Sequence, residues 1–177
     1  MLLSGPRRRP YGIGYRNTGA ARALAGAHRG SIFRLLVGEA LIRRDNVEAA
    51  KTWGIGGDPG AAAERVGCTA QEVRQGEYVL EACVSQYIGG TPFSWLPIDD
   101  LAGPASVRGY LERNSIALLS NFERPPLDPP SHNWLGHCSG RERVQRSGLW
   151  NNNHVHEQYD SRFLTELEKI VNFPSQG

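Results

Sequence analysis

The chain has little cysteine, almost no lysine and no long apolar run, and each shortage argues against a class of protein. Its three cysteines, Cys68, Cys83 and Cys138, are an odd number without a Cys-x-x-Cys pair, which disfavours both a disulfide framework and a structural zinc site. No apolar stretch approaches the roughly 20 residues of a membrane span, and no long apolar region follows the early arginines. We therefore expect free thiols, no membrane association and a cytoplasmic location.

Several catalytic signatures are absent as well. The glycines between Lys51 and Gly60 are not followed by Gly-Lys-Ser/Thr and do not have dinucleotide-binding spacing. The chain lacks the His-Glu-x-x-His motif of zinc proteases, the Pro-Cys-x-x-Cys motif of zinc deaminases and the Gly-x-Ser-x-Gly elbow of α/β-hydrolases. These absences disfavour all of those enzyme classes.

The composition fits one loop-rich globular domain. The chain has 177 residues, of which 40% are hydrophobic, and it contains 21 glycines and 11 prolines. Its net charge of +2 is too small to indicate a nucleic-acid-binding protein. However, lysine occurs only at positions 51 and 169, so the basic residues are almost all arginines, whose planar forks fit phosphates. The arginines that we expect to form a basic, nucleic-acid-binding face are Arg34, Arg43, Arg44, Arg141, Arg143 and Arg146.

Apolar spacing predicts helices over residues 31–44 and 69–88 and after Asp160. In the second helix, Val79, Cys83 and Tyr87 are spaced by four, and Leu80 and Val84 lie alongside them. In the last helix, the residues expected to dock as one apolar stripe are Phe163, Leu164, Leu167, Ile170 and Val171. Alternation over residues 93–98 predicts a short strand, and Pro97 indicates that this strand lies at a sheet edge or ends at that residue.

The segment from Gly109 to Asn121 sets a single carboxylate on an otherwise apolar helix. Leu111 and Leu118 belong to its apolar stripe, and Glu112 lies at the edge of that stripe. Asn121 comes just after the last apolar residue, so the helix is well bounded. We expect Glu112 to line a groove.

This segment resembles the helix of the GIY-YIG nuclease superfamily that carries a metal-binding glutamate, whose site is supported by a later asparagine. Glu112 and Asn121 are the matching positions. Two more blocks, at residues 28–35 and 147–164, are similar to bacterial members of that superfamily.

The resemblance implies an α/β (α+β) fold, in which three or four helices flank a small mixed sheet and a long loop-rich C-terminal extension follows. It implies a DNA endonuclease, active or degenerate, that uses Mg²⁺ or Mn²⁺. Glu112 would be the metal ligand, and Asn121, Arg29 and Tyr15 would complete the catalytic set. The alternative is a noncatalytic descendant of the fold that binds DNA or a protein.

The chain departs from the superfamily near its start. Gly12-Ile13-Gly14-Tyr15 stands for the first naming motif, but no Tyr-Ile-Gly-like triplet follows about ten residues later. We therefore expect residues 1–27 to be a divergent, poorly ordered segment and residues 28–177 to form the single domain.

A second alternative is a His-Asn-His nuclease, because residues 151–157 are rich in asparagine and histidine. Imidazole and carboxylate groups suit divalent metals. His154 and His156 are two residues apart, so they share a face only if this piece of chain is extended.

Overall fold

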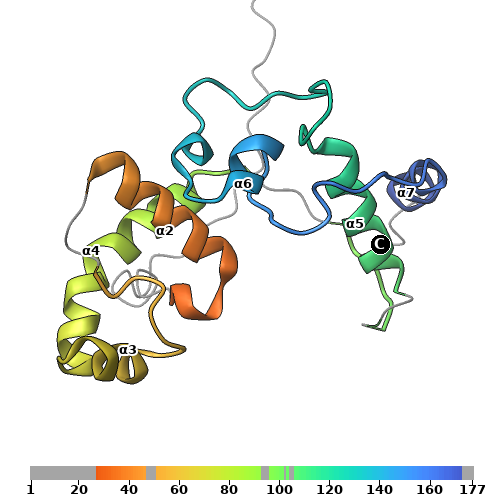
Figure 1. The fold of residues 1–177 in the computed structure, drawn as a ribbon. Helices are drawn as coiled ribbons and strands as arrows, with labels where there is room; N and C mark the ends of the chain where they lie inside the picture. Colours follow the sequence, from red (N-terminus) through yellow and green to blue (C-terminus); the bar gives the residue numbers. More distant parts are fainter. Residues whose placement is uncertain (1–26, 47–50, 93–95, 102, 104–105, 173–177) are drawn as a thin grey trace, which may run out of the picture.

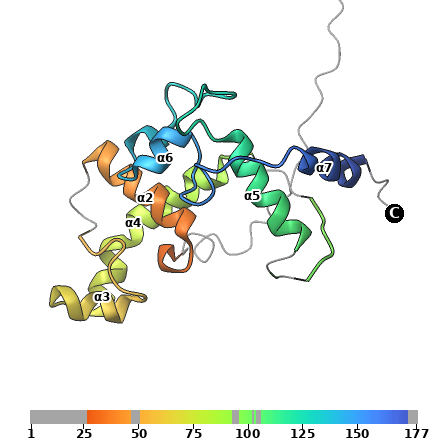
Figure 2. The same ribbon diagram turned by 45° about the vertical axis from the view of Figure 1, so that its right-hand side comes forward.

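The computed structural model describes residues 27–46, 51–92, 96–101, 103 and 106–172. These residues form six α-helices and two short 3-10 helices, namely η1 (His28–Gly30), α2 (Ile32–Asp45), α3 (Pro59–Val66), α4 (Ala70–Gly89), α5 (Val107–Leu119), η3 (Leu135–Cys138), α6 (Glu142–Ser147) and α7 (Arg162–Asn172). Figure 1 shows α2, α3 and α4 on one side, α5 and α7 on the other, and α6 between them. In the turned view of Figure 2, α6 lies above α2 and α4.

The prediction of a mixed sheet is wrong for the part of the chain that the structure describes, because none of these residues forms a strand. Residues 93–95 of the predicted strand, and Gly12 to Tyr15 of the motif, lie outside the described residues. Leu96 to Leu101 have no regular structure. Pro97 has no backbone N–H to donate, and an extended segment needs a partner strand to become part of a sheet.

The helices begin and end at local signals. Ser31 accepts a hydrogen bond from the backbone of α2, and Thr69 and Glu72 form a reciprocal capping box at the start of α4. Asp58 caps α3, in which Pro59 is the first residue, and Gly67 ends it in the left-handed conformation. The predicted helices over 31–44 and 69–88 are confirmed to within a residue or so.

The main core lies where α2 and α4 pack together and η3 covers α2. Its buried apolar residues are Val37, Ala40, Leu41, Trp53, Leu80, Val84 and Leu135. The predicted apolar positions of α4 are confirmed in part. Leu80 and Val84 are buried and Tyr87 packs against this core, whereas Val79 is 69% exposed and Cys83 is also exposed. A smaller cluster of Ala62, Ala63 and Val73 joins α3 to α4.

The last helix docks less completely than its apolar stripe predicts. Phe163 is buried at the contact between α5 and α7, but Leu164 is 43% and Val171 is 58% exposed. Leu167 and Ile170 are half-buried. Only one edge of the stripe meets α5, so the prediction of a fully buried stripe is wrong.

None of the helices among the described residues combines the length and the apolar character that crossing a bilayer requires. Cys68, Cys83 and Cys138 are all unpaired, as their number and spacing predict.

Candidate functional site

Helix α5 carries Glu112 on its solvent-facing side. The Ser106 hydroxyl starts the helix by accepting a hydrogen bond from the backbone of Gly109, at 3.0 Å. Tyr110 and Asn114 bond to Asp160, just before α7, and Glu112 lies about 200° around the helix from each of them. Its side chain is exposed, so α5 presents this carboxylate away from α7.

The Glu112 carboxylate takes part in none of the ion pairs among the described residues, although most carboxylates nearby are paired. Arg113 pairs with Glu157, and Arg162 pairs with Asp160 and holds the pKa of that carboxyl down, at about 2. Arg108, one turn before Glu112, pairs with Asp100, with 2.9 Å between its Nη2 and Oδ1. The Glu112 carboxylate is therefore available to a ligand or to solvent.

The side chains around Glu112 determine whether a zinc ion or a hydrated ion such as Mg²⁺ could bind there. No three His, Cys, Asp or Glu side chains come together as a metal site anywhere in the described residues. Zinc sites need three or four protein ligands. Mg²⁺ keeps several waters and is held through one or two carboxylates together with substrate phosphates. A single exposed glutamate therefore fits Mg²⁺ or Mn²⁺ and does not fit zinc.

Asn121 lies just beyond the C-terminal end of α5, more than two turns from Glu112. Its backbone N–H donates to the Ser147 carbonyl at 2.9 Å, and its Nδ2 donates to the Asp128 carbonyl at 3.1 Å. Its Oδ1 is buried and has no hydrogen-bond partner. Asn121 thus joins the end of α5 to the end of α6 and to the proline-rich segment.

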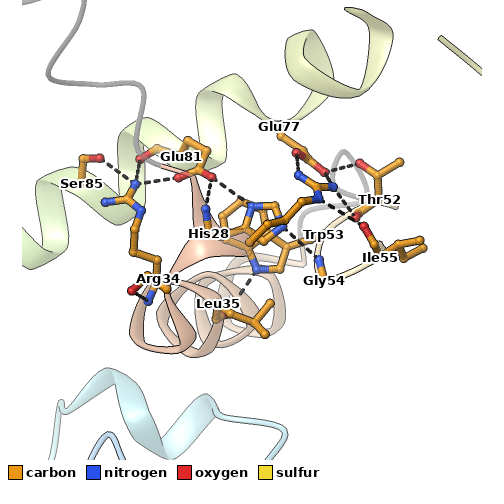
Figure 3. A network of polar contacts seen from close by, with 12 residues as sticks. His28, Arg34, Leu35, Thr52, Trp53, Gly54, Ile55, Glu77, Glu81 and Ser85 are labelled. Carbon is orange, nitrogen blue, oxygen red and sulfur yellow. Dashed lines mark hydrogen bonds and ion pairs between the residues drawn. The ribbon is translucent and has the colours of Figure 1, made fainter. Parts of the chain in front are cut away.

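Arg29 lies in a buried network of ion pairs, in which Figure 3 labels the two glutamates, Glu77 and Glu81. Its guanidinium forms two bonds to Glu77, at 2.6 and 2.7 Å, and also donates to the carbonyls of Thr52 and Ile55. The Arg29 side chain is 7% exposed and that of Glu77 is 5% exposed. Burial alone would raise the pKa of Glu77, but the bonds from Arg29 and Thr52 outweigh it and lower that pKa.

Glu81 holds the other half of this network. One of its oxygens, Oε1, accepts bonds from the backbone N–H and the Nδ1 of His28, and the other pairs with Arg34 at 2.6 Å. Because Gly54 donates its backbone N–H to Nε2 of His28, the ring proton is on Nδ1. Burial opposes ionisation of Glu81, yet these bonds hold its pKa below the usual value. The ring of His28 also stacks on Trp53, with 3.7 Å between centroids.

The structure does not bring the predicted catalytic set together. Arg29 and Arg34 lie in the network between η1, α2 and α4, which are to the left of α5 in Figure 1. Tyr15 lies outside the described residues. Glu112 and Asn121 share one helix and its end, and only Glu112 is exposed enough to meet a large substrate.

A pocket of about 560 Å³ opens beside the Arg29–Glu77 pair. Arg74 and Tyr78 of α4 also line it, and its wall includes Asp58 at the start of α3. None of its lining residues comes from α5, so it is separate from the Glu112 site.

Two of the predicted arginine groups do meet. Arg43, near the end of α2, and Arg141, just before α6, line the same hollow, and the guanidinium of Arg43 lies against Gly140. Arg44, Arg141 and Arg146 are paired with carboxylates, and Arg143 donates to the carbonyl of Asn152. Arg34 is 17% exposed and belongs to the buried network, so it cannot contribute to an exposed basic face.

The histidine-rich segment does not form a metal cluster. Nδ1 of His154 pairs with Glu157 at 2.8 Å, and that glutamate also binds Arg113. His156 is exposed. The His-Asn-His alternative gains no support from this arrangement.

Sequence reasoning missed Glu77, Glu81 and Asp100. Glu77 and Glu81 are one turn apart, and Leu80 and Val84 share their side of α4. Two glutamates among the inward positions of a helix could have indicated a buried ion-pair network, because buried carboxylates need cationic partners. Asp100 lies in an irregular segment and gave no such signal.

A family model described as the GIY-YIG domain matches residues 15–176, which leaves out only the first 14 residues and the last one. The match begins well before residue 28, where we expected the domain to start. It includes the whole of α5 and Asn121. Searches of curated proteins and of solved structures gave no match.

Proposed function

The chain belongs to the GIY-YIG domain family, which is of nuclease type, and on this premise we propose that it cleaves phosphodiester bonds in DNA with Mg²⁺ or Mn²⁺. Glu112 is the proposed metal ligand. The observation that carries the proposal is the combination of the family match over α5 with an exposed Glu112 that has no ion-pair partner among the described residues.

The proposed roles follow from what each side chain offers. When bound, the cation would neutralise charge on the scissile phosphate. Glu112 would hold it by one carboxylate, with waters and the phosphate as the other ligands. Asn121 braces the end of α5 through its bonds to residues 128 and 147. Tyr15 is the proposed group that orients the attacking water or hydroxide.

In this proposal Arg29 stabilises the fold, because four of its five N–H donors are already used within the protein. Releasing it to a phosphate would leave Glu77 buried and unpaired, which is costly. The cation that contacts the phosphate is therefore expected elsewhere.

The test is nicking of supercoiled plasmid DNA with Mg²⁺, with Mn²⁺ and with EDTA. Glu112→Gln keeps the shape of the side chain but removes the charge, so we expect it to abolish nicking while the thermal unfolding midpoint stays unchanged. Glu64→Gln is the matched control, since Glu64 is also an exposed glutamate on a helix. Nicking that survives Glu112→Gln would place the active site elsewhere.

The second candidate function is DNA binding without cleavage. The observation in its favour is that Arg43 and Arg141 meet in one hollow. Salt-sensitive binding of duplex DNA by a wild-type protein that never nicks it, with either metal, would support this function over the first.

A further inference from the structure

We propose that Asp100 is a positioning residue of the Glu112 site, because it holds the guanidinium of Arg108 and so leaves the Glu112 carboxylate for a divalent cation. This inference rests on the proposed function. Nothing in the family match assigns a role to Asp100 or to Arg108.

Arg108 and Glu112 are separated by one turn of α5 and therefore lie on the same side of it. Opposite charges at this spacing commonly pair, and elsewhere in this protein Glu142 and Arg146 do so across 2.7 Å. No such pair joins Arg108 to Glu112. The guanidinium of Arg108 pairs with another carboxylate instead, that of Asp100.

Asp100 holds Arg108 by three bonds. Nη2 of Arg108 donates to Oδ1 and to the carbonyl oxygen of Asp100, both at 2.9 Å. The backbone N–H of Arg108 donates to Oδ2 at 3.1 Å. The carboxylate thus satisfies one N–H of the first turn of α5 and binds the arginine side chain as well.

The charge state of Asp100 suits this role. The backbone hydrogen bond from Arg108 is the main reason that the pKa of Asp100 lies below its ordinary value, and the side-chain bond adds to it. Asp100 is therefore ionised at neutral pH. Its side chain is 16% exposed, whereas that of Arg108 is 54% exposed, so the carboxylate is the better fixed partner.

Without Asp100, two effects would act against a cation at Glu112. The freed guanidinium would pair with the Glu112 carboxylate and compete directly for it. It would also bring a positive charge close to the metal. A single carboxylate holds Mg²⁺ or Mn²⁺ weakly, so both effects are significant for the site.

The experiment is an NMR titration of the DNA-free, full-length protein with Mn²⁺, read as paramagnetic broadening of the backbone amide signals of Glu112 and Ser115. We expect the wild type to show broadening there and Glu112→Gln to lose it. Asp100→Asn should need about 1.5- to twofold more Mn²⁺ for the same broadening, the change expected from one helical ion pair. Asp100→Asn combined with Arg108→Gln should return to the wild-type concentration.

The outcomes separate this inference from the proposed function. Broadening that follows this pattern in a protein that never nicks DNA would refute the nuclease proposal and support the inference. Equal broadening in the wild type and in Asp100→Asn would overturn the inference, as would the absence of broadening at Glu112 in the wild type. The inference would also be overturned if Asp100→Asn needed more Mn²⁺ and the added Arg108→Gln substitution did not restore the wild-type concentration. Asp100 would then act only by starting α5.

Discussion

At the scale of single residues, the close packing of Trp53 on α2 requires a glycine at position 38. Trp53 lies across α2, with its Nε1 donating to the Leu35 carbonyl and its ring against His28. A Cβ added at Gly38 would lie 2.1 Å from Cζ2 of Trp53. The indole therefore needs a glycine here, although glycine is a poor residue for the middle of a helix.

Gly38→Ala is accordingly expected to destabilise the protein by about 1–3 kcal/mol through overpacking, despite the better helix propensity of alanine. Chemical denaturation measures the change. The matched control is Gly89→Ala near the end of α4, where nothing lies within 4 Å of the added Cβ. A Gly38→Ala protein that is as stable as the wild type would mean that Trp53 is not packed on α2.

A second prediction at this scale concerns Glu77. Replacing it with glutamine leaves Arg29 buried with its charge unmatched, so we expect a loss of about 3–5 kcal/mol. The control is Glu64→Gln on the exposed side of α3, which should change the free energy of unfolding by less than about 0.5 kcal/mol. Equal stabilities for the two variants would contradict the buried ion pair.

The buried glutamates Glu77 and Glu81 also predict how the stability of the protein depends on pH. The pKa values of Glu77 and Glu81 are lowered in the folded protein, so their contribution is complete above the unfolded-state pKa of about 4.3 and is lost as the pH falls through the folded values. We expect the unfolding midpoint in urea to change little between pH 6 and 7 and to decrease below about pH 4.5. The Glu77→Gln variant should show a smaller decrease, and an identical pH profile would refute the assignment.

At the scale of secondary-structure elements, α7 shows that an amphipathic pattern does not ensure burial. Its stripe has the right spacing, but α5 covers only the edge that includes Phe163. Tyr159 adds an edge-to-face contact with that ring, with 5.9 Å between centroids. The docking of α7 therefore depends on one side chain far more than on the rest.

Phe163→Ala should cost about 3–5 kcal/mol, since it removes a buried aromatic ring and leaves a cavity. Leu164→Ala, one position along the same stripe, should cost about 1 kcal/mol or less because Leu164 is 43% exposed. Urea titrations of the two variants test the difference. If Leu164→Ala proved as costly as Phe163→Ala, a further surface would have to cover the outer edge of α7.

At the scale of the whole molecule, the seven arginines to which the sequence assigned a role divide into two groups. Arg29 and Arg34 neutralise buried glutamates, whereas Arg43, Arg44, Arg141, Arg143 and Arg146 lie near the surface around α6 and the end of α2. Of these two groups, the second is the one exposed enough to reach phosphates. Several of its members are paired with carboxylates, so the face is less positive than its arginine content suggests.

We expect duplex DNA to bind this face mainly through phosphate contacts, with an affinity that falls steeply as salt is added. Arg43→Gln should reduce the slope of log K against log salt concentration by about 1, as the loss of one phosphate contact predicts. Arg65→Gln on α3 is the control and should leave the slope unchanged. An affinity that does not vary with salt would exclude the face as a DNA-binding surface.

The sequence by itself determined the features that depend on neighbours within a turn or two. Ser31, Asp58 and the Thr69–Glu72 box start three helices, and the helix that presents Glu112 was predicted with nearly the observed bounds. Caps and turn residues act through hydrogen bonds a few residues away, so their effect can be predicted from short stretches of sequence.

The tertiary structure alone decided which distant groups meet. Arg29 reaches Glu77 across 48 residues, and Asn121 reaches Ser147, pairings that no local pattern specifies. It also decided that Asp100, rather than Glu112, takes Arg108, and that only one edge of α7 is buried. Partners of this kind depend on how the helices pack, because burial and a fixed geometry select one partner among several of equal charge.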